Sequence, residues 1–211
     1  MNTKVDPLKI IQGGISPGMI ILCDMDGTLI DTDYANYMAY MCAVREVTKI
    51  ENIVEFSPRE RLNRESLRKR LPHLTDDQLE SIVALKSRYF SKHLPETRVN
   101  NQIADLLRRC GNTNRAVLVT NCREYRAVET LKYHGLFELF SRLIFREQIV
   151  ESGVLNKYAS ALLLLEVKPD DVIVFERDPV DVEMAMLAGI PKENIFSTAC
   201  LEVYYGKIPH L

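Results

Sequence analysis

Short apolar runs recur along the chain, and each is bounded by residues that favour turns. Residues 19–23, 116–119, 143–145 and 172–175 read MIILC, AVLV, LIF and VIVF, the third being the weakest. Continuous apolar runs of this length are typical of strands buried on both faces, as in a parallel sheet. The pattern therefore predicts at least four buried strands.

Helical patterns separate the later runs. Residues 124–134 and 157–167 have helical spacing, and a further helix starts at Asp178, with Pro179 in its first turn, and stops at Gly189. Strands that alternate with helices predict a parallel sheet covered by helices on both faces. The expected fold class is therefore α/β, with a three-layer Rossmann-like core.

Residues 34–94 break this alternation, because they contain no convincing strand. Apolar residues recur there at helical spacing, and charged residues fill the remaining positions. We expect three helices in this interval, over residues 34–47, 58–70 and 75–93. The chain then divides into a core, residues 1–31 and 95–211, and an inserted all-helical unit, residues 32–94, which we call the cap.

Two further segments lie before the first strand and directly after the cap. Residues 1–18 contain Gly13-Gly14 and Pro17-Gly18, which are turn signals, so we expect an irregular N-terminal arm. Residues 98–110 have a helical pattern and return the chain from the cap to the sheet.

The amino-acid composition limits the kinds of partner that we expect this protein to bind. Of 211 residues, 46% are apolar and 27% charged, which suits a soluble globule with a substantial core. The formal net charge of −2 lacks the basic excess of a nucleic-acid binder. No apolar stretch reaches the roughly 18 residues of a membrane span. We therefore expect neither nucleic acid nor membrane as a partner.

The cysteines and the N-terminal residues favour a cytoplasmic protein. The start, MNTKVDPLKI, carries acid and proline early and has no apolar core of a secretory signal. The chain has five cysteines and no CxxC pair, so we expect reduced thiols, at Cys23, Cys42, Cys110, Cys122 and Cys200.

Polar and acidic residues follow each of the main strands. Asp24 and Asp26 follow the first strand, Thr120 and Asn121 follow the second main strand, and the last strand leads into the acids Glu176, Asp178 and Asp181. In an open parallel sheet, ligands bind beyond the carboxyl ends of the strands. These distant residues are therefore expected to converge at one edge.

Several carboxylates at one edge repel each other unless a proton or a cation holds them together. Carboxylate oxygens with room for water suit Mg²⁺, while Thr120 and Asn121 offer donors for phosphate oxygens. Lys157 supplies an ammonium group in the same region of sequence. A nucleophile, a metal, phosphoryl donors and an acid/base are what phosphoryl transfer needs, and a carboxylate can itself be the nucleophile.

Three stretches resemble motifs of the haloacid dehalogenase-like superfamily. DMDGTL at 24–29 is similar to its first motif, DxDGT, VLVTN at 117–121 to its second, and FERDPVDVEMAMLAG at 175–189 to its fourth, acidic motif. The resemblance extends from about residue 19 to residue 195. The helical insert also stands where the family's C1-type helical cap belongs, directly after the first motif.

The resemblance implies a role for each site residue. Asp24 would attack the phosphorus and bind Mg²⁺, while Asp26 would serve as acid and base and bind the metal through its backbone carbonyl. Thr120 would hold the phosphoryl group, Lys157 would stabilise its charge, and Glu176 would complete the metal shell. The second aspartate favours phosphate chemistry over carbon–halogen cleavage. Further substrate or phosphate contacts are expected from Gly27, Thr28, Asn121 and Arg64.

One position departs from the family pattern. Arg177 stands where a second acid usually follows the first, so Asp178 or Asp181 would have to replace the missing metal ligand. The alternatives for these two are a plain helix N-cap and an acid in the first helical turn. Lys157 has the alternative of a surface lysine. We therefore expect Asp24, Asp26, Glu176 and Asp178 to be the metal ligands.

Basic residues also cluster in the cap, at positions 59–70. The ordinary interpretation is a solvated helix face. The alternative is that one or two arginines bind a remote anion of the substrate, and Arg64 and Arg68 share a helix face at i, i+4.

The sequence as a whole predicts a Mg²⁺-dependent phosphatase of a small phosphorylated metabolite, acting through an aspartyl-phosphate. A phosphomutase of the same family is an alternative. Because of Arg177, so is a catalytically impaired relative that acts as a binding or regulatory protein. The substrate and the oligomeric state are not specified by the sequence.

Overall fold

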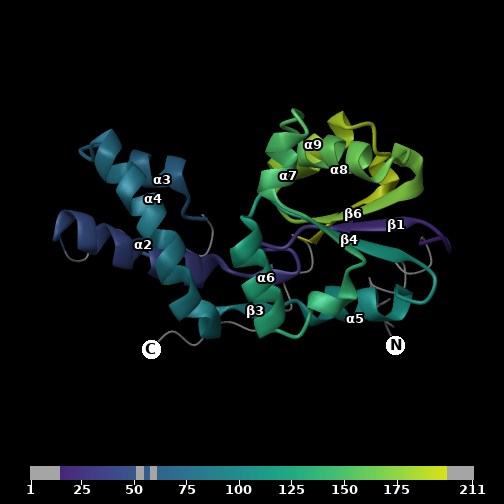
Figure 1. Cartoon of the computed structure of the whole chain (residues 1–211), viewed down its shortest axis with the longest axis horizontal. Helices are drawn as coiled ribbons and strands as arrows, with labels where there is room; N and C mark the ends of the chain where they lie inside the picture. Colours follow the sequence, from purple (N-terminus) through teal and green to yellow (C-terminus); the bar gives the residue numbers. More distant parts are fainter. Residues whose placement is uncertain (1–14, 51–54, 58–60, 199–211) are drawn as a thin grey trace, which may run out of the picture.

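The computed structural model describes residues 15–50, 55–57 and 61–198 of the chain. Figure 1 shows a sheet with helices on both faces and, at one end of it, a separate group of helices. Most of the expected N-terminal arm lies outside the described residues. No helix in the described ranges has the length and apolar character needed to span a bilayer.

The main sheet has five parallel strands in the order β5-β4-β1-β6-β7. Their bounds are β1 Ile20–Cys23, β4 Arg115–Val119, β5 Arg142–Ile144, β6 Val172–Glu176 and β7 Ile195–Ser197. The α/β class and the parallel sheet are thus confirmed, and the four predicted strands are all present. β7 was not predicted.

The register of the central strands brings their carboxyl ends level. Cys23, the last residue of β1, pairs with Leu118 of β4 on one side and with Phe175 of β6 on the other. The residues that follow these three positions therefore emerge side by side at one edge of the sheet.

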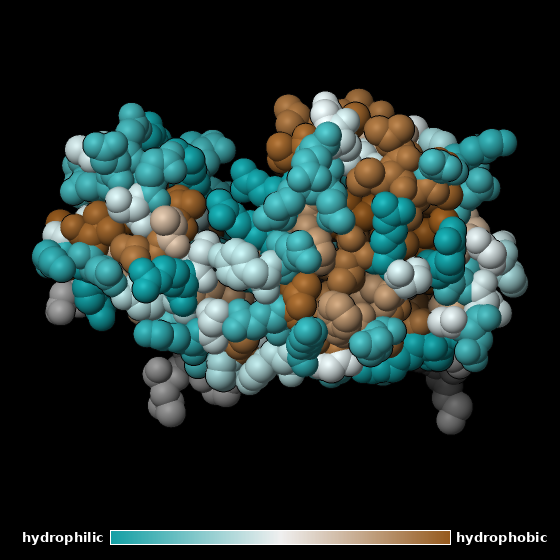
Figure 2. All heavy atoms as spheres, in the orientation of Figure 1, coloured by the Kyte–Doolittle hydropathy of each residue, from teal (hydrophilic) through white to brown (hydrophobic). Residues whose placement is uncertain are grey.

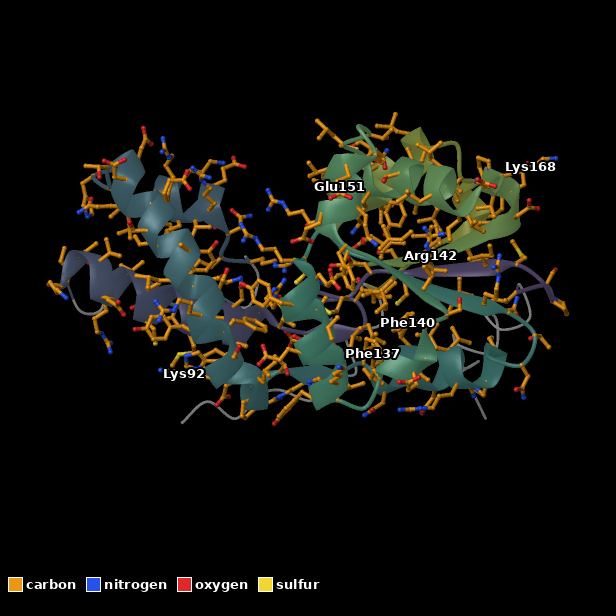
Figure 3. All side chains as sticks on the ribbon, in the orientation of Figure 1. Lys92, Phe137, Phe140, Arg142, Glu151 and Lys168 are labelled. Carbon is orange, nitrogen blue, oxygen red and sulfur yellow. The ribbon has the colours of Figure 1, made fainter. Side chains whose placement is uncertain are left out.

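Alternating residues of the strands face two helical layers. Helices α5 (Asn101–Cys110) and α6 (Glu124–Tyr133) cover one face, where they pack on residues such as Ile21 and Leu118. Phe137 and Phe140 pack against the same cluster (Figure 3). This arrangement explains why β1 is apolar throughout, since both of its faces are buried.

The opposite face of the sheet is covered by α7 (Arg146–Glu151), α8 (Lys157–Leu165) and α9 (Pro179–Leu187). Figure 2 shows apolar side chains gathered on the surface at these helices. The exposed apolar side chains on them include Val150, Leu163, Val180 and Leu187. α7 was not predicted, because a helix of six residues gives little periodic signal.

All regular secondary structure in the described residues of the cap is helical, as expected. These are α2 (Asp33–Thr48), α3 (Arg64–Arg70) and α4 (Asp76–Phe90), followed by a 3₁₀ helix at Ser91–Glu96. They enclose a small core of their own, which includes Tyr40, Val44, Leu67, Leu79 and Ile82. The residue limits of core and cap remain a prediction.

Two predicted helices start later than expected. α3 begins at Arg64 because Asn63 is extended and its side chain accepts a hydrogen bond from the Ser66 backbone, while residues 58–60 lie outside the described part. The helix predicted over residues 98–110 begins at Asn101, because β3 (Arg98–Val99) comes first.

β3 pairs antiparallel with β2 (Ile30–Asp31), so the chain enters and leaves the cap at adjacent points. Short 3₁₀ helices complete the core at Phe137–Leu139, Pro169–Asp171 and Lys192–Asn194.

Candidate active site

Three elements far apart in the sequence meet at the carboxyl edge of the sheet. Asp24 directly follows β1, Glu176 ends β6, and Lys157 begins α8. The ammonium of Lys157 lies 2.9 Å from Asp24 Oδ1, 2.7 Å from Glu176 Oε2 and 2.7 Å from Asp181 Oδ2. One buried cation is therefore shared by three carboxylates.

Local capping positions Lys157. The side chain of Asn156 accepts hydrogen bonds from the backbones of Tyr158 and Ala159, and its amide donates to the carbonyl of Met184 in α9. Burial would lower the pKa of Lys157, but the three carboxylates raise it well above the ordinary value. The lysine is therefore a fixed positive charge and not the surface lysine of the alternative interpretation.

Glu176 is surrounded by donors. Its Oε1 accepts from the backbones of Arg177 (2.7 Å) and Asp178 (2.9 Å), and its Oε2 accepts from the Tyr158 hydroxyl (2.7 Å) as well as from Lys157. Burial raises its pKa, but Lys157 and these hydrogen bonds outweigh burial and lower it. The carboxylate is held ionised.

Asp24 is different. Burial and the neighbouring charge of Glu176 raise its pKa to about 7, against the opposing effect of Lys157. Only its Oδ1 is held by Lys157, and no described residue donates a hydrogen bond to its Oδ2. Asp24 therefore has one carboxylate oxygen left over for a ligand.

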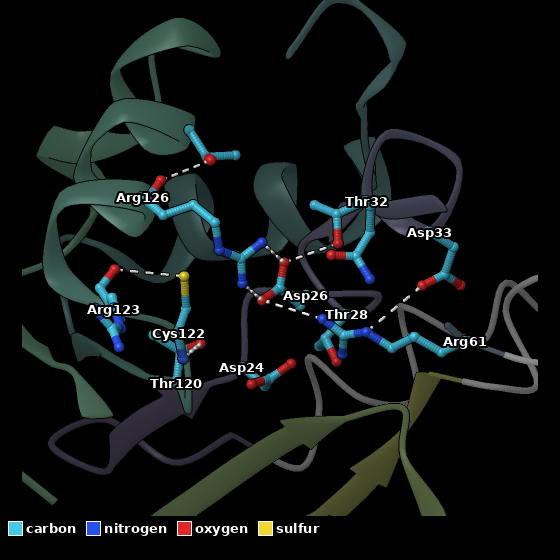
Figure 4. Close-up of polar contacts among 12 residues, drawn as sticks. Asp24, Asp26, Thr28, Thr32, Asp33, Arg61, Thr120, Cys122, Arg123 and Arg126 are labelled. Atoms are coloured by element: carbon cyan, nitrogen blue, oxygen red, sulfur yellow. Dashed lines mark hydrogen bonds and ion pairs between the residues drawn. The ribbon is translucent and has the colours of Figure 1, made fainter. Parts of the chain in front are cut away.

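Asp26 is held by two guanidinium groups (Figure 4). Arg126 of α6 binds both of its oxygens, at 3.1 Å to Oδ1 and in a close contact to Oδ2. Arg61 of the cap lies 3.3 Å from Oδ2, and the Thr32 hydroxyl donates to Oδ1 at 2.7 Å. Burial raises the pKa of Asp26, but the two arginines lower it well below its usual range.

Thr120 stands at the end of β4 with 1% of its surface exposed. Its hydroxyl accepts from the backbone of Cys122 at 3.1 Å, and no described residue accepts its proton. Thr28 is also buried, and its hydroxyl lies 3.5 Å from Glu176. Asn121 is exposed to solvent beside Thr120.

Arg177 and Gly27 fit against each other. Gly27 has a φ of +85°, and a β-carbon there would collide with the guanidinium of Arg177. The same guanidinium makes a 2.8 Å ion pair with Asp33 in the first turn of α2. The backbone conformation at position 27 therefore favours glycine, and a larger residue there would also displace the guanidinium of Arg177.

Two of the predicted site residues are not brought to the cluster. Asp178 is exposed and serves as the N-cap of α9, accepting from Val180, so it is Asp181 that reaches Lys157. Arg64 is exposed on the cap and pairs with Glu80. The same holds for Arg68, which pairs with Asp76.

Sequence reasoning missed Arg126, and in the cap it singled out Arg64 and Arg68, which pair with acids of the cap and not with Asp26. Arg61 stands in the basic stretch that the sequence shows, three residues before Arg64, and only the late start of α3 decides which of them faces the core. Arg126 has no distinguishing signal beyond its place in the first turn of α6, after the TN pair.

The charges and donors fit a divalent cation next to Asp24. With Lys157, the carboxylates of Asp24, Glu176 and Asp181 leave two negative charges in excess at this end of the site. Within the described residues no three acidic, His or Cys side chains form a ready-made metal site. Mg²⁺, however, needs only one or two protein ligands and keeps several waters. The free oxygen of Asp24 and the backbone carbonyl of Asp26 are of the right chemical type.

Comparison with known proteins gives the class to which this fold and site belong. A sequence model described as haloacid dehalogenase-like hydrolase matches residues 21–193, most of the chain. The protein therefore belongs to the haloacid dehalogenase-like hydrolase family, as the motifs predicted. No curated protein matches the chain.

Solved structures share the fold at low sequence identity. A haloacid dehalogenase-like family hydrolase from Streptococcus pneumoniae has 19% identity and a TM-score of 0.65, over 90% of this chain and 91% of its own. A predicted phosphoglycolate phosphatase from Haemophilus somnus has 16% identity and a TM-score of 0.64, over 83% and 84%. A candidate β-phosphoglucomutase from Thermotoga maritima has 23% identity and a TM-score of 0.59, over 85% and 84%. At these identities the likeness concerns the fold alone.

Proposed function

We propose that this hydrolase is a Mg²⁺-dependent phosphatase that acts on a small phosphorylated metabolite, with Asp24 as the nucleophile. The observation that carries the proposal is the contact of Lys157 with both Asp24 and Glu176, which brings three separate elements to one point at the sheet edge. The family membership and the neighbours with phosphatase names support the same reaction class.

In the first step, an oxygen of Asp24 attacks the phosphorus, and the bond between phosphorus and the ester oxygen breaks. The product is an aspartyl-phosphate on Asp24, and the leaving oxygen takes a proton. In this proposed step, Lys157 and the hydroxyl of Thr120 donate hydrogen bonds to the phosphoryl oxygens. The free oxygen of Asp24 and the backbone carbonyl of Asp26 would hold Mg²⁺, which would supply further positive charge to those oxygens and reduce the repulsion between Asp24 and the phosphoryl group that it attacks.

In the second step, Asp26 takes a proton from a water molecule, which attacks the phosphorus and releases phosphate and free Asp24. Asp26 is ionised where it stands, so it is ready to act as a base. To act as the acid in the first step, Asp26 must first separate from Arg126 and Arg61 and take up a proton from solvent, which it then gives to the leaving oxygen.

Arg177 was the reason to consider a catalytically impaired relative. Its side chain pairs with Asp33 of the cap, and it contributes to Glu176 through its backbone N–H. The ionised cluster of Glu176 and Lys157 is complete with arginine at position 177, so we favour the enzyme.

The test is hydrolysis of a panel of phosphorylated metabolites by the full chain, followed as released phosphate, with Mg²⁺ and with EDTA. We expect turnover that needs the metal and that falls by about a thousandfold or more in Asp24→Asn. Rapid quenching is expected to trap a phosphorylated protein, labelled at Asp24. Release of phosphate in Asp24→Asn at the wild-type rate would refute the proposal. Transfer of the phosphoryl group to a second sugar hydroxyl, without free phosphate, would favour the phosphomutase.

A further inference from the structure

A second charged cluster lies around Asp26, where residues of the cap meet the core. Arg61 comes from the segment before α3, Lys86 from α4, and Arg126 from α6 of the core. The guanidinium of Arg126 and the ammonium of Lys86 both lie over the ring of Phe90, at 4.7 Å and 5.4 Å from its centroid. Two elements of the cap and one of the core thus bring three cations together.

Lys86 has no acidic partner among the described residues. Its ammonium also lies 5.3 Å from the centroid of the Tyr40 ring, so its surroundings are largely aromatic. Burial and the nearby charge of Arg126 lower the pKa of Lys86 to about 7. A half-buried lysine that faces other cations is unfavourable unless an anion joins it.

The two ends of the site have opposite charge. Around Asp24 the carboxylates exceed the cations by two charges, as described above. Around Asp26 the cations exceed the carboxylates, with Arg61, Lys86, Arg126 and Arg177 set against Asp26 and Asp33. The first end matches a divalent metal ion. The second matches an anionic group that none of the described residues supplies.

We propose that Arg61, Lys86 and Arg126 bind a second anionic group of the substrate, a carboxylate or phosphate remote from the phosphoryl group that is transferred. This rests on the proposed phosphatase function and narrows its substrate class to phosphate esters with two anionic groups. The remote anion takes the place of the Asp26 carboxylate on the two guanidinium groups and gives Lys86 its missing partner.

This exchange links substrate recognition to the work of Asp26. Asp26 must leave the arginines to reach the ester oxygen. If no other anion replaces its carboxylate, Arg126, with 10% of its side chain exposed, is left without a counter-charge. A substrate with a remote anion removes that cost, whereas an ester without one does not. The remote anion also ties Arg61 and Lys86 of the cap to Arg126 of the core. The site therefore selects its substrate by charge.

The experiment compares alkyl monophosphates of equal length that end in a carboxylate, a phosphate or an uncharged carboxamide. We expect kcat/KM of the wild-type protein to be about 10–100-fold higher for the two anionic esters than for the carboxamide. Lys86→Met is expected to reduce this preference at least about fivefold, mainly through KM for the anionic esters. Arg68→Gln, which removes an exposed cap arginine paired with Asp76, is the matched control and is expected to keep the wild-type preference.

A binding experiment without turnover tests the anion site independently of the proposed phosphatase activity. Malonate, which carries two carboxylates and no phosphoryl group, is titrated calorimetrically into metal-free Asp24→Asn protein with and without Lys86→Met. We expect binding that weakens at least about fivefold without Lys86. Hydrolysis of esters without any preference for a terminal anion overturns the anion site and leaves the phosphatase intact. Absence of hydrolysis, with Lys86-dependent binding of malonate, overturns the phosphatase and leaves the anion site.

Discussion

Arg177 and Asp33 form a 2.8 Å ion pair that joins the loop after β6 to the first residue of the first cap helix. In the sequence, Arg177 stands out because an acid is expected at that position of the family's fourth motif. In the fold, its guanidinium is a link between core and cap that also covers Gly27. The departure from the motif thus coincides with a contact across the junction of the two parts.

A double-mutant cycle with Arg177→Gln and Asp33→Asn measures this link. Both side chains are partly buried, so we expect a coupling energy of about 1 kcal/mol in urea unfolding. The exposed pair Arg108 and Asp105, 2.7 Å apart within α5, provides the control and is expected to couple by less than about 0.5 kcal/mol. Strictly additive effects of the two substitutions would contradict a direct link between Arg177 and Asp33.

Lys157→Met tests the shared cation. The substitution leaves Asp24, Glu176 and Asp181 together without their counter-charge, and breaking a buried pair in this way costs about 3–5 kcal/mol. We expect that loss in urea unfolding of the metal-free protein. Mg²⁺ is expected to recover part of it, because a cation that binds only the folded state stabilises that state.

Lys168→Met is the matched control, since Lys168 is exposed just beyond the end of α8. We expect it to unfold within about 0.5 kcal/mol of wild type, with no added response to Mg²⁺. If Lys157→Met proves as stable as Lys168→Met, the lysine is not what holds the three carboxylates together.

The strands and the edge of the site were predictable because their signals are local. Four continuous apolar runs gave the parallel strands, and the rule that strand ends share an edge brought Asp24, Thr120 and Glu176 to the same side of the sheet. Lys157 followed from the resemblance to the family. In each case the residue is next to the end of an element, so a small error in the element's bounds does not move it.

The positions of Arg61, Arg126 and Asp181 in the site depend on tertiary packing, which a sequence pattern does not show. Arg61 rather than Arg64 faces Asp26 because the Asn63 N-cap delays α3. Asp178 was expected to reach the metal, but its carboxylate caps α9 and Asp181 lies nearer to Lys157. These outcomes are fixed only by tertiary contacts.

Asp24→Asn is expected to stabilise the metal-free protein at pH 8 while it abolishes turnover. Burial raises the pKa of Asp24 to about 7, above the ordinary value of about 4 for an aspartate. Between these values the unfolded chain is ionised and the folded chain holds the proton, so this residue lowers stability as pH rises, and the penalty is complete above pH 7. An asparagine carries no such penalty.

The gain at pH 8 is at most about 4 kcal/mol, three pKa units at about 1.4 kcal/mol each, and it is expected to vanish below pH 4, where aspartate is protonated in both states. Thermal unfolding of both proteins in EDTA across this range measures it. Asp105→Asn, at an exposed position of α5, should give a difference that does not vary with pH in this way. A constant difference for Asp24→Asn as well would mean that Asp24 is not destabilised by its surroundings.

Lys86→Met is expected to raise stability below neutral pH. The pKa of Lys86 is lowered to about 7, whereas a lysine in the unfolded chain has a pKa of about 10.4. Between these values the unfolded chain binds the extra proton, so stability from this residue rises with pH, and the full penalty for burying the charge applies below pH 7. Methionine keeps much of the contact with Tyr40 and Phe90 and carries no charge.

We therefore expect Lys86→Met to be more stable than wild type at pH 6 by up to about 4 kcal/mol, three pKa units at about 1.4 kcal/mol each, with a difference that shrinks toward pH 10. Lys92→Met is the control, because Lys92 is exposed and also lies over an aromatic ring, that of Tyr89. Adding malonate at pH 6 should reverse the order, since only the wild-type protein has the ammonium that an anion can join. Equal unfolding temperatures of wild type and Lys86→Met at pH 6, with and without malonate, would show that Lys86 is neither strained nor a ligand for an anion.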